Sequence, residues 1–206
     1  MLYSTLPGIV LGFHGCDESV GEQVLAGKSH LRKSDKVYDW LGHGIYFWEN
    51  NPERAQQYAV DGMRGKRGSS SKIKKAFVLG AAIDLGFCLN LLDSSALSEV
   101  QEAHEFLAKS TEAIGARMPQ NENPPEGKDS LRRHLDCAVF KALHEIREEK
   151  DDPAYDSVRG VFWEGKDLYP GTTLKEKNHI QFCIRNPNCI KGYFRVREAD
   201  LNYLLP

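Results

Sequence analysis

The sequence predicts an α+β protein, because strand-like and helix-like segments follow one another without the regular alternation of a doubly wound sheet. Short runs rich in β-branched and aromatic residues occur between residues 9 and 196, and helical patterns interrupt them at irregular intervals. The chain has 206 residues, of which 41% are hydrophobic and 27% are charged. This length and composition are typical of one folded domain, which we expect to span residues 1–206.

In the first quarter of the chain, a strand is expected at Ile9–His14, which is apolar and is followed by Gly15. Asp17 has the position of an N-cap for a short helix that ends at Gly27. The polar segment that follows is expected to be irregular. The next β-rich run, Gly44–Trp48, predicts a second strand.

Asn51 and Pro52 mark the start of the next helix, because a capping residue precedes proline at the first helical position. We expect this helix to end near Val60 and a buried strand to follow at Ala76–Asp84. The loop between them is basic, with Arg64, Lys66, Arg67, Lys72, Lys74 and Lys75. It is either a solvated loop or a contact for phosphate groups.

In the second half of the chain, helices are expected at Ser95–Lys109 and after Asp129, which we interpret as an N-cap. The apolar residues of the second helix follow a 3.6-residue period: Leu131, Leu135, Ala138, Val139, Ala142 and Ile146. The remaining strands are expected at Val158–Trp163, His179–Arg185 and Ile190–Val196.

Charge and composition exclude several classes of protein. The 27 basic and 29 acidic residues nearly cancel, so no global field attracts the chain to nucleic acid or to an anionic membrane. No apolar run approaches the roughly 18 residues of a membrane helix, and we expect no membrane partner. The N-terminus shows no secretory signal. Five scattered cysteines without a CxxC pair indicate reduced thiols, no metal site and a cytoplasmic location.

Two short motifs combine histidine or tyrosine with neighbouring glycines. The first is Phe13-His14-Gly15, and the second is Gly42-His43-Gly44-Ile45-Tyr46-Phe47. Glycine in a strand often marks the close approach of a ligand or of another backbone. From the residues alone, His14 is either a core histidine with its hydrogen bonds satisfied or a site residue. Tyr46 by itself is either a core residue or a site residue.

Together the two motifs resemble the poly(ADP-ribose) polymerase-like branch of the ADP-ribosyltransferase superfamily. That branch has His-Gly at the end of an early strand and Gly-x-Gly-Ile-Tyr-Phe before a short helix with a second tyrosine, here Tyr58. The resemblance covers roughly residues 9–60, and a strand at 178–185 extends it. It implies a split, strongly twisted antiparallel β core with inserted helices around an NAD cleft. It also implies that NAD is the co-substrate.

The resemblance assigns roles to individual residues. His14 would bind a ribose hydroxyl, and Gly15 would offer its backbone N–H and C=O to the nicotinamide carboxamide. Tyr46 and Tyr58 would stack on the nicotinamide ring, and Gly44 belongs to the same binding motif. Such a site holds the cleaving glycosidic bond and its oxocarbenium-like ribose in position rather than moving protons.

The third catalytic residue of that family is usually a glutamate on a late strand, and no acid lies on the corresponding strand here. Gln181 is our choice for this position, with His179, Asn178 and Glu176 as alternatives. A glutamine can bind a ribose hydroxyl but cannot neutralise a cation, which disfavours chain elongation. A second departure is Ala55, where the polymerases have serine.

The resemblance therefore implies mono-ADP-ribosyl transfer from NAD to a macromolecular acceptor, either protein or nucleic acid, with release of nicotinamide. Such a transferase, if of a small bacterial toxin type, could have an antitoxin or an ADP-ribose hydrolase as partner. NAD glycohydrolysis and an inactive NAD- or ADP-ribose-binding module are the alternatives. Candidates for activating an acceptor, or otherwise simply solvated acids, are Glu49, Glu164, Asp167 and Glu176.

Overall fold

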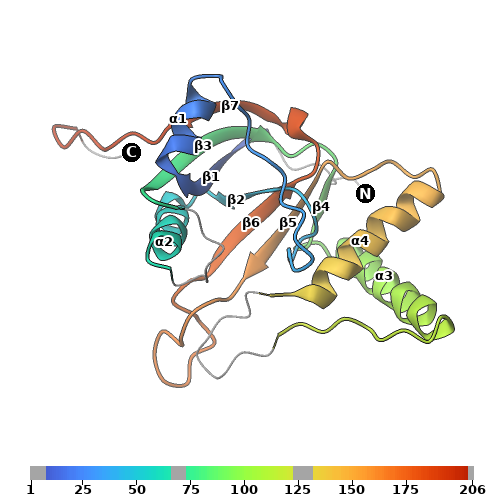
Figure 1. Ribbon diagram of the computed structural model, residues 1–206. Helices are drawn as coiled ribbons and strands as arrows, with labels where there is room; N and C mark the ends of the chain where they lie inside the picture. Colours follow the sequence, from blue (N-terminus) through green and yellow to red (C-terminus); the bar gives the residue numbers. More distant parts are fainter. Residues whose placement is uncertain (1–7, 66–72, 123–131, 204–206) are drawn as a thin grey trace.

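The computed structural model describes residues 8–65, 73–122 and 132–203 (Figure 1). Within these ranges seven strands form one sheet and four α-helices flank it, in agreement with the expected α+β class. The strands are β1 (Ile9–Asp17), β2 (Ile45–Glu49), β3 (Ala76–Asp84), β4 (Cys88–Asn90), β5 (Ser157–Phe162), β6 (His179–Ile184) and β7 (Ile190–Arg195). The helices are α1 (Glu18–Leu25), α2 (Pro52–Met63), α3 (Ser94–Ala113) and α4 (His134–Glu149), with a 3₁₀ turn η1 (Pro187–Cys189).

The strands lie in the order β4-β5-β6-β2-β1-β3-β7. All neighbouring strands pair antiparallel except β4 and β5, which are parallel, so the expectation of a wholly antiparallel core is corrected at this edge. The junction in the middle of the sheet is narrow. β1 pairs with β3 along its whole length, whereas only Gly12–Glu49 and Phe13–Trp48 pair β1 with β2.

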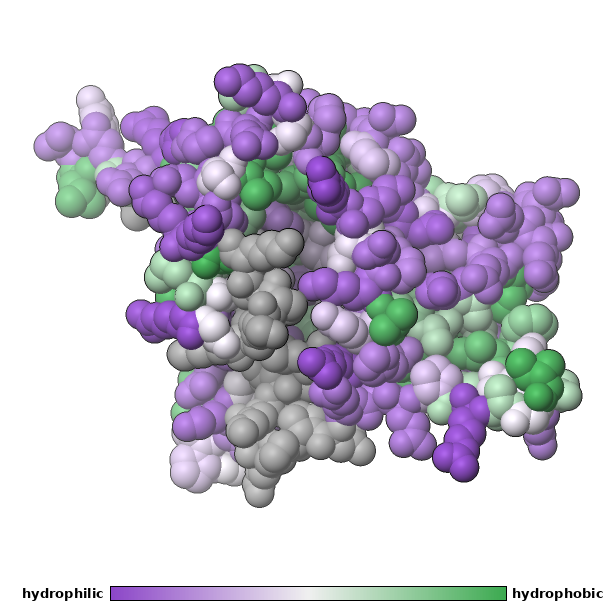
Figure 2. All heavy atoms as spheres, in the orientation of Figure 1, coloured by the Kyte–Doolittle hydropathy of each residue, from purple (hydrophilic) through white to green (hydrophobic). Residues whose placement is uncertain are grey.

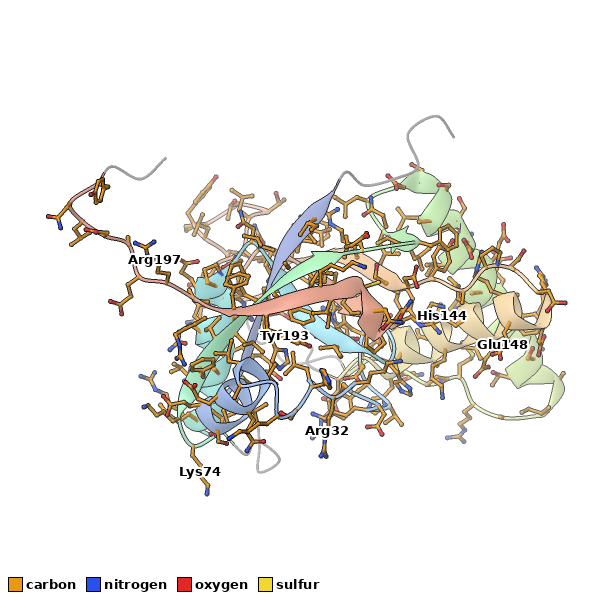
Figure 3. All side chains as sticks on the ribbon, turned by 90° about the horizontal axis from the view of Figure 1, so that it is seen from above. Arg32, Lys74, His144, Glu148, Tyr193 and Arg197 are labelled. Atoms are coloured by element: carbon orange, nitrogen blue, oxygen red, sulfur yellow. The ribbon has the colours of Figure 1, made fainter. Side chains whose placement is uncertain are left out.

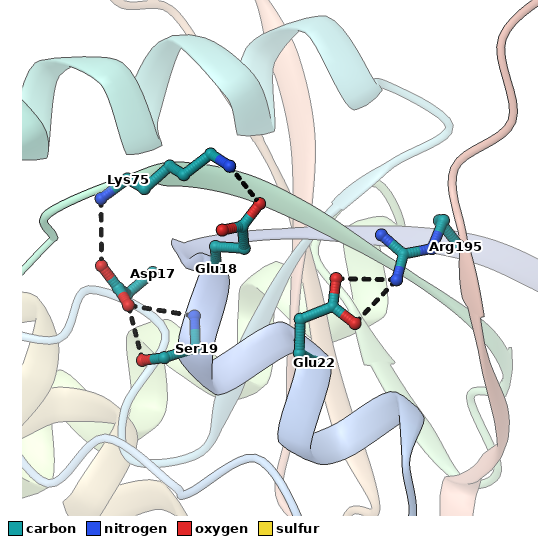
Figure 4. Close-up of polar contacts among 6 residues, drawn as sticks. All are labelled: Asp17, Glu18, Ser19, Glu22, Lys75 and Arg195. Atoms are coloured by element: carbon teal, nitrogen blue, oxygen red, sulfur yellow. Dashed lines mark hydrogen bonds and ion pairs between the residues drawn. The ribbon is translucent and has the colours of Figure 1, made fainter.

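The predicted turn from β1 into α1 is confirmed. The side chain of Asp17 caps the helix by accepting hydrogen bonds from the Ser19 backbone N–H at 3.0 Å and the Ser19 hydroxyl at 2.6 Å (Figure 4). It also accepts from the N–H groups of Lys74 and Lys75 before β3. These bonds, led by that of the Ser19 hydroxyl, lower the pKa of Asp17. An ion pair between Glu22 and Arg195, at 2.7 Å, ties α1 to β7 (Figure 4).

The other local predictions vary in accuracy. The strand Ala76–Asp84 has its predicted bounds, and α2 begins at Pro52 with the Asn51 side chain accepting from Arg54 N–H. The strand expected to end at His14 continues to Asp17. Strand β4, only three residues long, was not predicted.

The last helix begins later than its sequence pattern predicts. α4 starts at His134 with Arg133 as its N-cap residue, so the prediction that Asp129 caps it is wrong. Asp129 and Leu131 lie outside the described residues. The predicted apolar stripe is confirmed in part, since Val139 and Ala142 are buried. The buried side of α4 also contains Cys137, Phe140 and Leu143.

Side chains alternate across each strand, so Phe47 and Trp48 point to opposite faces of the sheet. We call these sides the Phe47 face and the Trp48 face. On the Phe47 face, α1 packs over a core that contains Cys16, Val24, Ile45, Phe47, Leu79, Ile83, Phe182 and Ile184. On the Trp48 face, α2 covers Phe13 and Trp48 through Ala55. The α3–α4 pair covers the other end of the same face, over Leu89, Val158 and Cys183.

The outer surface in the orientation of Figure 2 is mostly hydrophilic, and hydrophobic side chains gather over α3 and α4. Leu97 and Phe106 of α3 are about half exposed, at 52% and 50%. Among the described helices, none has the length and apolar character needed to cross a membrane.

Candidate active site at the junction of β1 and β2

The pairing of β1 with β2 ends at Phe13 and Trp48. Before that pair, the Asn50 N–H donates to the Leu11 carbonyl at 2.9 Å, so the backbone polar groups of Leu11 point toward β2. Groups of alternate residues point the same way along a strand. The next hydrogen-bonded pair would be Gly15 with Tyr46, and it is not formed. The two strands diverge here, which opens a gap in the middle of the sheet.

Gly15 lies at this gap. Because it is four residues after Leu11 on the same strand, its N–H and C=O point toward β2, as those of Leu11 do. Its missing side chain has a packing reason. A Cβ atom at this position would lie 2.2 Å from the Ala55 carbonyl oxygen and 3.3 Å from Cδ1 of Tyr58. The glycine therefore lets α2 approach β1 closely, and this brings Tyr58 beside the backbone groups of Gly15.

His14 spans the gap. Its Nδ1 lies 2.8 Å from the backbone carbonyl oxygen of Tyr46. Because a carbonyl only accepts hydrogen bonds, Nδ1 must carry the proton, and Nε2 of the neutral ring is an acceptor. Burial lowers the pKa of His14, against a smaller opposite effect of this hydrogen bond, and so favours the neutral ring. The ring also meets Phe47 edge-on at 5.7 Å.

The Tyr46 side chain is held on the Trp48 face. Its hydroxyl donates to the Gly42 carbonyl at 2.7 Å and accepts from the Leu41 N–H at 3.0 Å. Its ring packs against the core beneath α3 and α4, and burial raises the pKa of the phenol well above its usual value. Gly44 has a packing role, since a Cβ there would meet Cys183 Sγ and the Ile184 carbonyl.

Trp48 is a residue that sequence analysis did not select. It is 4% exposed, and Tyr58 packs against it with ring centroids 4.9 Å apart. Its indole Nε1 is buried and has no hydrogen-bond partner among the described residues. A buried indole N–H normally finds a partner. The available signal was its place in the run Gly44–Trp48, directly after the tyrosine motif.

Gln181 lies opposite Trp48 in the sheet and is 9% exposed. Its Oε1 accepts from Nε1 of Trp40 at 3.0 Å, and since an indole only donates, this contact fixes which end of the amide is the carbonyl. His179 lies on the same face two residues earlier. Its ring stacks on Phe162 at 5.3 Å and lies 6.3 Å from Trp48, while Nδ1 contacts the Lys177 carbonyl.

The other two candidates for the third position lie away from this face. Asn178 and Glu176 are exposed, and Glu176 accepts from the Lys166 N–H within its own loop. Three of the four acids considered for activating an acceptor are held in ion pairs. Glu164, which is largely buried, pairs with the buried Arg54 at 2.7 Å, and Glu49 binds the guanidinium of Arg159 through both carboxylate oxygens.

Asp167 forms an exposed ion pair with Lys175. Most of the basic loop, residues 66–72, lies outside the described residues. In the described ranges, no group of three or more His, Cys, Asp or Glu side chains has a geometry suited to a metal ion.

The predicted site residues thus fall into two sets. Gly15, Gly44, Tyr46, Tyr58 and Gln181 belong to the Trp48 face, by side-chain alternation and their contacts. His14 belongs to the Phe47 face. The two sets meet only at the gap between β1 and β2.

No model of a known protein family matches this chain. No curated protein is significantly similar to it in sequence. The groups at the gap themselves define its chemistry. The groups near the gap are the backbone N–H and C=O of Gly15, the neutral imidazole of His14, the amide of Gln181 and the aromatic side chains of Trp48 and Tyr58. These groups can bind and orient a flat amide and sugar hydroxyls, and Gln181 places no negative charge beside them.

Proposed function

We propose that the chain transfers ADP-ribose from NAD to a macromolecular acceptor and releases nicotinamide. The observation that carries this proposal is the orientation of Gly15, whose N–H and C=O face the gap beyond the last β1–β2 pair. A primary carboxamide has one acceptor and two donors, so it can pair with both groups as a neighbouring strand would. Nicotinamide is such a carboxamide on a flat aromatic ring.

The surroundings of Gly15 support the same ligand. Tyr58 lies beside Gly15, and Trp48 packs on Tyr58, so two aromatic side chains adjoin the position proposed for the ring. Stacking of this kind contributes about 0.5–1.5 kcal/mol per pair beyond the buried area. The neutral His14 accepts a hydrogen bond at Nε2, which suits a ribose hydroxyl.

Catalysis then consists of positioning. The glycosidic bond between nicotinamide and ribose breaks with its electron pair passing to nicotinamide, and the acceptor attacks the ribose carbon and releases its proton to solvent. Gln181 orients the ribose through its amide, whose carbonyl end is held by Trp40. Without a carboxylate at this position the positive charge on the ribose is stabilised less, so transfer is expected to be slow.

The decisive experiment measures nicotinamide release from labelled NAD with purified protein, alone and with added cell lysate, RNA or DNA. His14→Asn keeps a donor near the position of Nδ1 for the Tyr46 carbonyl but removes Nε2. We expect release in the wild type, at least tenfold less in His14→Asn, and no change in the exposed control His30→Asn.

The distribution of label separates the alternatives. Label on one acceptor pool establishes a transferase and its substrate class. Release without any acceptor identifies an NAD glycohydrolase. Binding of NAD without release identifies an inactive binding module, and absence of NAD binding contradicts the proposal.

A further inference from the structure

A concave pocket lies between α4, the loop that precedes β2 and the segment around the end of β6. It has a volume of about 490 Å³. It is lined by Lys33, His43, Lys141, His144, Glu145, Glu148, Ala154, Tyr155, Asp156, Arg185 and Asn186. None of these residues belongs to the predicted NAD site. In Figure 3, His144 and Glu148 lie one turn apart on α4, with His144 nearer to β7.

Arg185 is the central cation of this pocket. One of its guanidinium nitrogens donates to the Tyr155 carbonyl at 2.7 Å. The side chain is partly buried, and in the described ranges it has no carboxylate within ion-pair distance. Burial lowers the pKa of Arg185, although the group stays charged at neutral pH. Its remaining donors form no ion pair with a described carboxylate, so they can bind an anion that enters the pocket.

Two imidazoles beside Arg185 also lack partners. Both ring nitrogens of His144 and Nε2 of His43 are buried without a hydrogen bond to any described residue. Lys33 and Lys141 add two exposed ammonium groups at the rim. The pocket therefore brings together three cations and two imidazoles. Three of the four imidazole nitrogens are buried without a hydrogen bond to any described residue.

The pocket also contains three carboxylates, and two of them, Asp156 and Glu148, attract Arg185 without forming an ion pair with it. Asp156 is engaged by the Phe87 N–H at 2.9 Å and by the Asn186 amide at 2.7 Å. Glu145 and Glu148 are exposed on α4. We propose that the pocket binds the phosphate group of a small phosphorylated molecule, with Arg185 as the principal contact and His43, His144, Lys33 and Lys141 around it. Phosphate fits better than a carboxylate because it carries more charge and has three or more acceptor oxygens.

Glu145 and Glu148 then face the part of the ligand beyond the phosphate. Carboxylates accept hydrogen bonds from hydroxyl groups, which favours a phosphorylated sugar or nucleotide over inorganic phosphate. The volume of the pocket is within the range of small-molecule sites.

Phosphate binding has a specific signature at His144. In the unliganded protein, burial and then the cations Arg185 and Arg147 lower the pKa of His144 to about 3. The titratable and charged groups around it are Lys141, Glu145, Arg147 and Glu148 of α4, Lys33 and His43 before β2, and Tyr155, Asp156 and Arg185 of the sheet side. A bound phosphate offsets the charge of Arg185 and offers the ring an acceptor. The pKa of His144 therefore rises on binding.

The test uses inorganic phosphate, pyrophosphate and ribose 5-phosphate as probes, at constant ionic strength, with calorimetry and with proton NMR of the imidazole resonances. The His144 resonance is assigned by its loss in His144→Asn. We expect saturable binding and a rise of at least one unit in the pKa of His144. We also expect Arg185→Gln to weaken binding at least tenfold.

A second variant tests the proposal even if Arg185→Gln does not fold. Lys141→Gln changes an exposed residue and is expected to weaken binding about threefold, whereas the matched control Lys109→Gln on α3 leaves it unchanged. Tighter binding of ribose 5-phosphate than of phosphate identifies an ester as the ligand, and equal binding identifies phosphate itself. The proposal is overturned if no probe binds at millimolar concentration, or if Lys109→Gln weakens binding as much as Lys141→Gln. His14→Asn is expected to retain phosphate binding, so this result is separate from NAD turnover.

Discussion

The Nδ1 atom of His14, the residue directly after the last paired residue of β1, lies 2.8 Å from the backbone carbonyl oxygen of Tyr46, which is two residues before the last paired residue of β2. The His14 side chain thus donates to the Tyr46 carbonyl. If the strand pairing continued, the Gly15 N–H would donate to that carbonyl instead. The contact holds the two strands together next to Gly15, where their backbones no longer pair. Because this contact uses Nδ1 of His14, Nε2 is the ring atom that would meet the ribose hydroxyl in the proposed NAD site.

Gly15 is expected to be intolerant of any side chain. Because a Cβ would lie 2.2 Å from the Ala55 carbonyl oxygen, Gly15→Ala must displace α2 from β1. We expect a loss of at least about 2 kcal/mol in the free energy of unfolding, measured by urea denaturation. Gly192→Ala on β7 is the matched control, because its Cβ enters open space and stability should hardly change. Equal effects of the two substitutions would show that α2 does not pack as closely as described.

The third position of the proposed NAD site can be assigned by substitution on β6. Gln181→Met removes the amide and should reduce nicotinamide release at least tenfold. Gln181→Glu keeps an acceptor for the Trp40 indole and adds the negative charge that stabilises the ribose cation, so release should increase. His179→Asn is the comparison on the same face. A full rate in Gln181→Met together with a loss in His179→Asn would assign the position to His179.

The buried ion pair between Arg54 and Glu164 should be important for stability. The two side chains are only 9% and 14% exposed, so Glu164→Gln leaves a buried guanidinium without its counter-ion. Removing one partner of such a pair costs about 3–5 kcal/mol. The exposed pair of Asp167 with Lys175 is the control, and Asp167→Asn should cost less than about 1 kcal/mol. Chemical denaturation of both variants measures the difference, and similar losses would contradict the assignment of Glu164 to the interior.

His144 should make the folded state less stable in mild acid. Its pKa is lowered to about 3 in the folded protein, so the unfolded chain binds more protons below the ordinary histidine pKa of about 6.5. Stability therefore falls as the pH decreases, and this residue accounts for about 2 kcal/mol of the loss between pH 7 and pH 5. Urea denaturation at both pH values, in phosphate-free buffer, should show a smaller loss in His144→Asn. An unchanged loss in that variant would mean that His144 is not buried beside Arg185 and Arg147.

Local features of the fold were predictable because they depend on neighbouring residues. Asp17 and Asn51 cap helices through hydrogen bonds to backbone groups two or three positions away. The bounds of β3 follow from a buried apolar run, Ala76–Asp84. By contrast, the three residues of β4 have no local pattern, and they form a strand only by pairing with β5 nearly 70 residues later.

The candidate site also combines features that the sequence predicts with features that depend on the tertiary structure. The sequence by itself determined which residue types are available, namely a histidine and a glycine on one strand, the tyrosine motif of another and an amide on a third. Only the tertiary structure decided that β1 and β2 separate after Phe13 and Trp48, and that Ala55 and Tyr58 press on Gly15. It also placed Trp48 beside Tyr58 and gathered His43, His144 and Arg185 around one pocket. The physical reason is range: caps and periodicity act over a few residues, whereas strand divergence, close packing and burial of charge depend on segments that meet only in the folded chain.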